Sequence, residues 1–299
     1  MSPMYQGITP IHFMNDFYVK REDLAFWSSL DYPSGSKVRQ YFNMVKAYVP
    51  QHSVPGHAAG YSDLCYSDLT CLVGCSANSC QQVYLAATSK ILGMKGIVYT
   101  AKRKIRSEAT LYAENLGCEI VEVRPAYLSV IRKAARQRAI DEKNILQWDR
   151  KAAILDTAAQ CENLPADIQR IIVPTGSGLT AAGVLLGIAQ HFKGDSYPSV
   201  VIVATSPMAS PEKVMQMAMA ANQNRIFPMS PLEFIHPSTP YDVPVIERLP
   251  DGTPLDCFYA GKALKYLTAG NMIWLPGLRP VVSMPKICQD AFQSWKGPT

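Results

Sequence analysis

The chain has 299 residues, of which 48% are hydrophobic and 18% charged, with a formal net charge of +5. This composition is typical of a globular protein with one large domain or two modest ones. No apolar run approaches the roughly 18 residues that a membrane span needs. The N-terminus has no basic segment leading into an apolar one, so we expect a cytoplasmic protein without a secretory signal.

Apolar periodicity and capping residues predict alternating strands and helices along the first half of the chain. The expected strands are 16–23, 68–76, 95–101 and 118–125, and the expected helices are 37–48, 79–94, 107–117 and 127–143. In the helix at 107–117, Ser107 is the expected N-cap and Gly117 the expected stop. A strand–helix alternation of this kind predicts βαβ units with parallel strands.

The second half repeats the pattern up to residue 207 and then loses it. The expected elements are helices 154–164 and 179–192, strands 169–178 and 199–207, a loop-rich segment 209–258, and a helix around 260–270. The predicted fold is therefore α/β, with two domains that each hold a mostly parallel sheet flanked by helices. We expect a smaller domain, 46–150, inserted into a larger cofactor-binding domain formed by 1–45 plus 151–299.

Lys37 stands where a helix is expected to begin. The preceding Ser-Gly-Ser, 34–36, provides turn and N-cap residues, and apolar residues then recur at helical spacing. The helix dipole is positive in the first turn, so it disfavours an ammonium group and favours the free amine. A free amine forms Schiff bases with aldehydes. Taken alone, however, Lys37 is more simply explained as a surface lysine.

The segment IIVPTGSGLTAAG carries the strongest local motif. A buried strand ends, Gly176-Ser177-Gly178 turns, and a helix begins near Leu179, which is the arrangement of a phosphate-binding turn. A dinucleotide is disfavoured because Gly183 comes two positions late and the next strand ends without an acid. The Gly-Lys-Ser/Thr of a Walker A motif is absent. A single terminal phosphate remains, with a ligand-free βα turn as the alternative.

A phosphate-binding turn together with an uncharged lysine is what pyridoxal 5′-phosphate requires. Four segments also resemble one enzyme family, in its order, over about residues 9–275: YVKREDL with SGSKVRQY, SANSCQQVYLAATSKILGMK, VPTGSGLTAAGVLLG and LDCFYAGKALKYL. They resemble the fold-type II pyridoxal-phosphate enzymes (tryptophan synthase β-like), nearest the aminocyclopropane-carboxylate deaminase and D-cysteine desulfhydrase group. The resemblance also implies a homodimer.

The resemblance implies a role for each matching position. Lys37 corresponds to the Schiff-base lysine, and Tyr259 corresponds to a catalytic tyrosine near the pyridine ring and substrate. Asn78 corresponds to the residue beside the 3′-oxygen of the cofactor. The implied substrate-binding residues are Ser76, Ala77, Asn78 and Ser79, and the implied phosphate-binding residues are Gly176, Ser177, Gly178, Leu179 and Thr180. From the residues alone, Asn78 is a helix N-cap and Tyr259 a half-buried aromatic.

Three departures from the family pattern concern the chemistry. Ala77 replaces a serine that exchanges protons near the substrate. Ala260 stands where the family has a partner for the pyridine nitrogen, so this nitrogen is either unpaired or paired with Thr205 or Ser206. The segment WLPGLRPVVSM replaces a C-terminal glycine pair. The sequence therefore predicts a retained cofactor site with altered chemistry.

Three functions are compatible with these features. The first is a lyase, deaminase or decarboxylase that acts at Cα of a small amino acid through Lys37. The second is processing of an amino acid attached to a thymine base in DNA, as in phage thymidine hypermodification. The third is a catalytically degenerate protein that binds pyridoxal phosphate or an amino acid.

Two basic stretches bear on the second function. Lys102–Arg106 and Arg132–Arg138 are either solvated helix faces or a contact with DNA. The eight cysteines show no zinc spacing and are expected to be buried reduced thiols.

Overall fold

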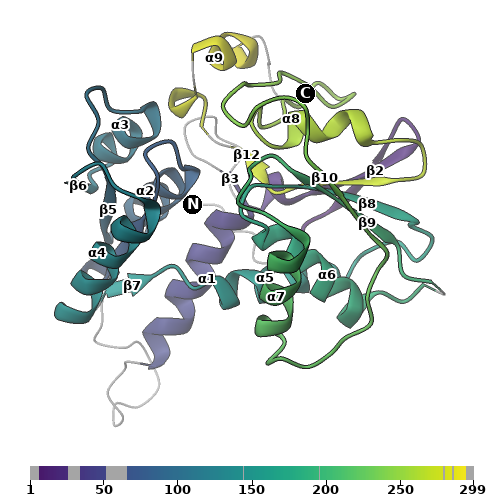
Figure 1. The fold of residues 1–299 in the computed structure, drawn as a ribbon, viewed down its shortest axis with the longest axis horizontal. Coiled ribbons are helices and arrows are strands. Elements are labelled where there is room, and N and C mark those ends of the chain that lie inside the picture. The colour runs from purple at the N-terminus through teal and green to yellow at the C-terminus, as the bar shows by residue number, and fades with distance from the viewer. Residues whose placement is uncertain are drawn as a thin grey trace.

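A computed structural model describes residues 7–25, 34–51, 66–143, 145–194, 196–278, 280–284 and 286–293. It has two main β-sheets with helices on both faces, as Figure 1 shows. The α/β fold with mostly parallel sheets is therefore confirmed. No helix among these residues combines the length and apolar character that crossing a membrane requires.

The four-stranded sheet is entirely parallel and has the strand order β6-β5-β4-β7. Its strands are β4 (Thr70–Gly74), β5 (Lys95–Ala101), β6 (Glu119–Val123) and β7 (Ile145–Gln147). The accompanying helices are α1 (Ser36–Gln51), α2 (Cys80–Leu92), α3 (Glu108–Asn115) and α4 (Leu128–Asp141). Alternate residues of β4 face opposite sides: Cys71 and Val73 pack with α1 and α2, and Leu72 packs with α4.

The six-stranded sheet joins strands from distant parts of the chain in the order β1-β2-β11-β8-β9-β10. The strands are β1 (Ile11–Met14), β2 (Phe17–Arg21), β8 (Arg170–Thr175), β9 (Ser199–Ala204), β10 (Leu232–Ile235) and β11 (Met272–Leu275). All of its pairings are parallel except β1 with β2. In Figure 1 the N-terminal β2 lies beside the sheet of β8, β9 and β10.

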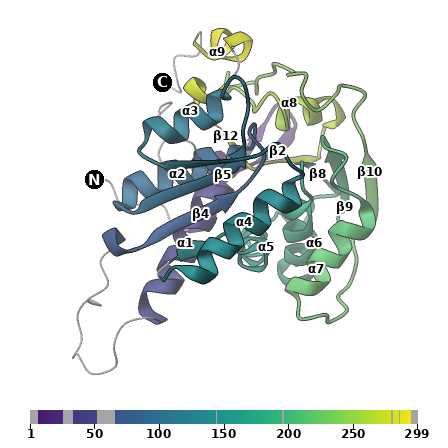
Figure 2. The same ribbon diagram turned by 60° about the vertical axis from the view of Figure 1, so that its left-hand side comes forward.

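Helices cover both faces of this second sheet, as Figure 2 shows from another side. They are α5 (Arg150–Ala159), α6 (Leu179–His191), α7 (Pro211–Ala221) and α8 (Ala260–Ala263). Ile171 and Val173 of β8 pack with α5, α6 and α7, whereas Ile172 packs with α8. The C-terminal helix α9 (Lys286–Gln293) lies outside both sheets (Figure 1).

Helix α1 begins beside a short antiparallel pairing of β3 (Ser34–Gly35) with β12 (Gly277–Leu278). Its apolar face packs into the core of the four-stranded sheet: Val38, Tyr41, Phe42 and Val45. Its opposite face reaches α5, where Gln40 Nε2 donates to the carbonyl oxygen of Ala153 at 3.1 Å. The division into domains 1–45 plus 151–299 and 46–150 stays a prediction, and α1 contacts elements of both sets.

Several expected elements differ from the structure. The segment 209–258 is not merely loop-rich, because it contains α7 and β10. The expected helix around 260–270 is short: α8 is followed only by a 3₁₀ turn, Leu264–Tyr266. Strands β1, β7 and β11 were not expected; each has only three or four residues, too few for a clear alternation.

The two basic stretches also differ from each other. Residues 102–106 form a loop after β5 and not a helix face, whereas 132–138 belong to α4 as expected. The expected burial of the thiols is confirmed for seven cysteines, and Cys65 lies outside the described residues.

Candidate active site

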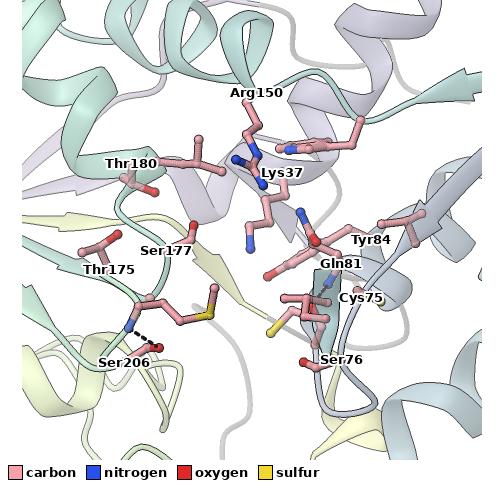
Figure 3. Close-up of a pocket in the computed structure, with 18 of the residues that line it drawn as sticks. Lys37, Cys75, Ser76, Gln81, Tyr84, Arg150, Thr175, Ser177, Thr180 and Ser206 are labelled. Carbon is pink, nitrogen blue, oxygen red and sulfur yellow. Dashed lines mark hydrogen bonds between the residues drawn. The ribbon is translucent and has the colours of Figure 1, made fainter. Parts of the chain in front are cut away.

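A cavity of about 540 Å³ is lined by residues from elements of both sheets. It lies next to the ends of two parallel strands: Gly74 closes β4 and Thr175 closes β8, and both line it. Ligands in α/β proteins bind at the carboxyl ends of parallel strands, where the loops of neighbouring βα units meet. Figure 3 shows side chains entering this cavity from several directions.

Lys37 lies in the first turn of α1, as predicted, and is half-buried in the cavity lining. The preceding Ser36 donates from its backbone N and its Oγ to the carbonyl oxygen of Pro276, at 2.9 and 2.8 Å. Lys37 Nζ lies 5.7 Å from the centre of the Tyr84 ring. The start of the helix is thus fixed to the segment before β12, and the amine extends into the cavity (Figure 3).

Gly35 and Gly277 permit this arrangement. They face each other in the β3–β12 pair, with φ angles of +120° and +139°. A Cβ built on Gly277 would meet Gly35 Cα at 2.9 Å, and one built on Gly35 would meet Gly277 Cα even more closely. Gly277 was missed in the sequence because its partner is far away in the chain. Its only local signal is the glycine after a proline, which is typical of a turn.

The predicted phosphate-binding turn connects β8 to α6 and lines the same cavity through Gly176, Ser177, Leu179 and Thr180. Gly178 is buried behind them with φ of +89°, and its N donates to Thr175 Oγ1 at 3.1 Å. Helix α6 has no side-chain N-cap. Its first backbone N–H groups are therefore available to an anion.

Of the four residues expected to bind substrate, two line the cavity and two do not. Ser76 and Ser79 line the cavity, and Ser79 caps α2 by accepting from the N of Gln81 at 3.2 Å. Ala77 is buried outside the lining, with its carbonyl oxygen accepting from Gln82 Nε2 and from Ser107 Oγ. Asn78 is exposed, and its Oδ1 accepts from Arg103 Nη1 at 3.4 Å. The role of Asn78 beside the cofactor stays a prediction.

Tyr259 lines the cavity next to the phosphate-binding turn. A Cβ on Gly176 would meet Tyr259 Cε1 at 2.7 Å, so a glycine there lets the ring lie against the turn. The Tyr259 hydroxyl is 3.0 Å from that of Tyr241, which also lines the cavity. The buried Asp256, missed in the sequence, lines it too, and its Oδ1 accepts from the backbone N of Tyr259 at 3.1 Å.

Of the three residues considered for the pyridine nitrogen, one lines the cavity and two do not. Ala260 is buried in the core beside Leu249 and is not part of the lining. Thr205 is buried, and its Oγ1 donates to the carbonyl oxygen of Thr175 at 3.3 Å. Ser206 lines the cavity.

Three arginines also line the cavity. The sequence analysis identified two of them only as part of a basic stretch and did not identify the third. Arg132 and Arg136 come from α4, and Arg150 opens α5. Burial lowers the pKa of Arg132, and the nearby positive charge of Arg150 lowers it further. Spacing of four residues on α4 is the signal that places Arg132 and Arg136 on one helix face.

No protein-family model and no curated protein matches the chain. Solved structures do match it. A homologue of ACC deaminase superposes with a TM-score of 0.66 at 15% identity, covering 92% of this chain and 90% of the other. An O-acetylserine-dependent cystathionine β-synthase from Helicobacter pylori superposes with a TM-score of 0.58 at 14% identity, covering 100% and 98%.

A threonine deaminase from Solanum lycopersicum gives a TM-score of 0.58 at 12% identity and covers 98% of this chain and 85% of the other. Identities this low show the shared fold. The fold inferred from the four sequence motifs is confirmed: this chain has the fold of the fold-type II pyridoxal-phosphate enzymes.

Proposed function

We propose that the chain is a pyridoxal-phosphate-dependent enzyme that uses Lys37 for chemistry at Cα of an amino acid, of the lyase, deaminase or decarboxylase type. The observation that carries the proposal is that Lys37 and the turn Gly176–Thr180 line one cavity. These two features are separated by about 140 positions in the sequence, and each has an ordinary structural explanation alone. Their meeting in one cavity favours a shared ligand with a phosphate and an aldehyde.

The residues present fit pyridoxal phosphate. The uncapped start of α6 and the hydroxyls of Ser177 and Thr180 would hold its phosphate, and Lys37 would hold its aldehyde carbon. The lack of a Cβ at Gly176 lets the Tyr259 side chain lie against the turn, where it would border the bound cofactor. Bound there, the cofactor supplies an electron sink for a bond broken at Cα.

The chain's own side chains supply binding and proton transfer. The hydroxyls of Ser76 and Ser79, at the positive start of α2, orient a substrate carboxylate. Lys37 Nζ, once released by the substrate's amine, is the base that holds or returns the proton at Cα. The hydroxyl pair of Tyr241 and Tyr259 provides a second group able to hold a proton in the cavity.

Replacing Lys37 by alanine tests the proposal. The wild-type protein incubated with pyridoxal phosphate should show the visible absorbance of a lysine-bound cofactor. After borohydride reduction, mass spectrometry should find the cofactor attached to the peptide that contains Lys37. Lys37→Ala should lose both signals because it lacks the amine. Lys90→Ala, which changes an exposed lysine of α2, should keep both. A wild-type protein with neither the band nor the adduct contradicts the proposal.

Product analysis assigns the reaction type within this proposal. Loss of CO2 from an added amino acid indicates decarboxylation, and ammonia with a keto acid indicates deamination. A loaded protein that converts no amino acid corresponds to the degenerate binding protein.

A second candidate function, action on an amino acid attached to a thymine base in DNA, has one specific observation in its favour. Lys102, Arg103 and Lys104 are exposed in the loop after β5. Arg103 reaches Asn78, within the turn whose Ser76 and Ser79 line the cavity. Positive charge therefore lies close to the cavity wall. Arg106 and Arg138 contribute less, because each is paired with two glutamates.

Under this second function, the wild-type protein should bind duplex DNA, with affinity falling as salt rises. We expect a smaller salt dependence when Lys102, Arg103 and Lys104 are changed together to glutamine. The slope of log K against log salt concentration should fall in magnitude by about 3 if each side chain contacts one phosphate. A fluorescence anisotropy titration measures this. Absence of binding even at low salt removes the second candidate.

A further inference from the structure

The cavity has a cationic side that the proposed chemistry does not use. Arg132 and Arg136 are four residues apart on α4, and Arg150 begins α5. In Figure 3 Arg150 enters from above Lys37, whereas Ser177 and Thr180 lie on the left. We call Arg132, Arg136 and Arg150 the arginine cluster. The arginine cluster comes from α4 and α5, whereas the phosphate-binding turn joins β8 to α6, and both line the same cavity.

The arginine cluster has no acidic partner in the described part of the chain. Arg138, on the same helix, makes ion pairs with Glu119 and Glu142. Among the described residues, the three arginines of the cluster make no such ion pair. The two acids of the lining are engaged elsewhere. Asp149 caps α5 by accepting from the N of Lys151, and Asp256 accepts from the backbone N of Tyr259.

The electrostatics of Arg132 also favour an anion at this side of the cavity. Burial lowers the pKa of the half-buried Arg132, and the nearby charge of the exposed Arg150 lowers it further. A partly buried charge is ordinarily paired, and an anionic ligand in the cavity would offset the positive charge at Arg132.

We propose that the arginine cluster binds a phosphate ester on the side chain of the substrate, so that the substrate is a phosphorylated amino acid. Guanidinium groups bind phosphate oxygens in bidentate fashion, and three of them suit a dianion better than a single carboxylate. The amino-acid half of this inference rests on the proposed function. The phosphate half rests on the cluster alone.

The test is a calorimetric titration of the cofactor-loaded protein with O-phospho-L-serine, L-serine and L-glutamate. In the loaded protein the cofactor's own phosphate fills the turn at Gly176–Thr180, so a second phosphate reports on the cluster. Hydrogen bonds to charged groups convert to about tenfold or more in affinity each. O-Phosphoserine should therefore bind at least tenfold more tightly than either competitor. Arg132→Gln with Arg150→Gln should abolish the preference.

The matched control is Lys133→Gln, which removes an exposed charge from α4 outside the cavity and should keep the preference. A loaded protein that binds serine or glutamate as well as phosphoserine overturns the inference and leaves the proposed function standing. Binding of a short thymidine oligonucleotide in place of phosphoserine also overturns it, in favour of a nucleic-acid phosphate.

If the protein binds no cofactor at all, the proposed function is wrong, but the inference about the arginine cluster can still be tested. The cluster is then tested by titrating the protein with inorganic phosphate. The double variant should bind it at least tenfold more weakly than wild type, and equal binding overturns the inference.

Discussion

Replacing Gly35 by alanine is expected to lower the free energy of unfolding by about 2 to 5 kcal/mol and to disable the lysine site. Its φ of +120° is a conformation that residues with a Cβ rarely adopt. The new Cβ would also press on backbone atoms, Gly277 Cα and the Pro276 carbonyl oxygen, which cannot rotate away. The chain must therefore separate at the β3–β12 pair.

The functional consequence follows from what this pair holds. Ser36 donates twice to the carbonyl oxygen of Pro276, and Lys37 is the next residue. If the two segments move apart, the start of α1 loses these bonds and Lys37 moves relative to the phosphate-binding turn. The absorbance of the lysine-bound cofactor should then weaken or disappear in a protein that is still folded at low temperature.

Gly93→Ala is the matched control for Gly35→Ala. Gly93 also has a positive φ, +68°, but a Cβ there has nothing within 4 Å. It should lose only about 1 kcal/mol in a denaturant titration and keep the cofactor absorbance. Equal stability of the two variants, with normal absorbance for Gly35→Ala, shows that the close approach of the two glycines does not matter.

The sequence was sufficient for features with local signals. Lys37 follows a turn and opens an apolar helix, and Gly176–Thr180 lie between a strand and a helix, so both were placed correctly on their elements. A missed local signal is equally clear: Ser210 caps α7 and Pro211 is its first residue, a helix start that the surrounding prolines obscured.

Features that depend on distant contacts could not be predicted in this way. Gly277 and Asp256 matter because of residues that only the tertiary fold brings near them. The arginines of α4 were recognised as a charged stretch, but helical spacing alone does not say whether a face meets solvent or a cavity. Arg138 is paired with glutamates, whereas Arg132 faces the cavity lining, and only the packing of α4 on its sheet separates them.

Replacing Arg39 by methionine is expected to cost about 3 to 5 kcal/mol of folding stability at pH 8. Arg39 is two residues after Lys37 and only 1% exposed. Its Nη2 lies 2.8 Å from Asp156 Oδ2 on α5 and 3.3 Å from Glu22 Oε2, just after β2. Methionine keeps the apolar volume but leaves the buried Glu22 carboxylate without its cation.

This loss should depend on pH in a defined direction. Burial raises the pKa of Glu22, and the positive charge of Arg39 opposes the shift. Without Arg39 the pKa rises further, so the folded variant takes up a proton that the unfolded chain has released. A carboxyl with a raised folded pKa is least costly at acid pH and most costly above that pKa. The deficit of Arg39→Met relative to wild type should therefore be smaller at pH 5 than at pH 8.

A second substitution separates the buried charge from lost packing. Glu22→Gln removes the charge but keeps the oxygen that accepts from Trp274 Nε1, a hydrogen bond of 2.9 Å. The double variant should recover a substantial part of the stability lost by Arg39→Met and lose its pH dependence, which a double-mutant cycle measures directly. The control Arg138→Met breaks more exposed ion pairs and should cost under about 1 kcal/mol.

Arg39→Met also tests how the lysine site is supported. Helix α1 carries both Lys37 and Arg39 in its first turn, so the buried ion pairs of Arg39 fix this helix against the end of β2 and against α5. The variant should bind pyridoxal phosphate more weakly at pH 8, and Glu22→Gln should restore that binding together with stability. Normal cofactor binding in a destabilised Arg39→Met protein means instead that the β3–β12 pair alone positions Lys37.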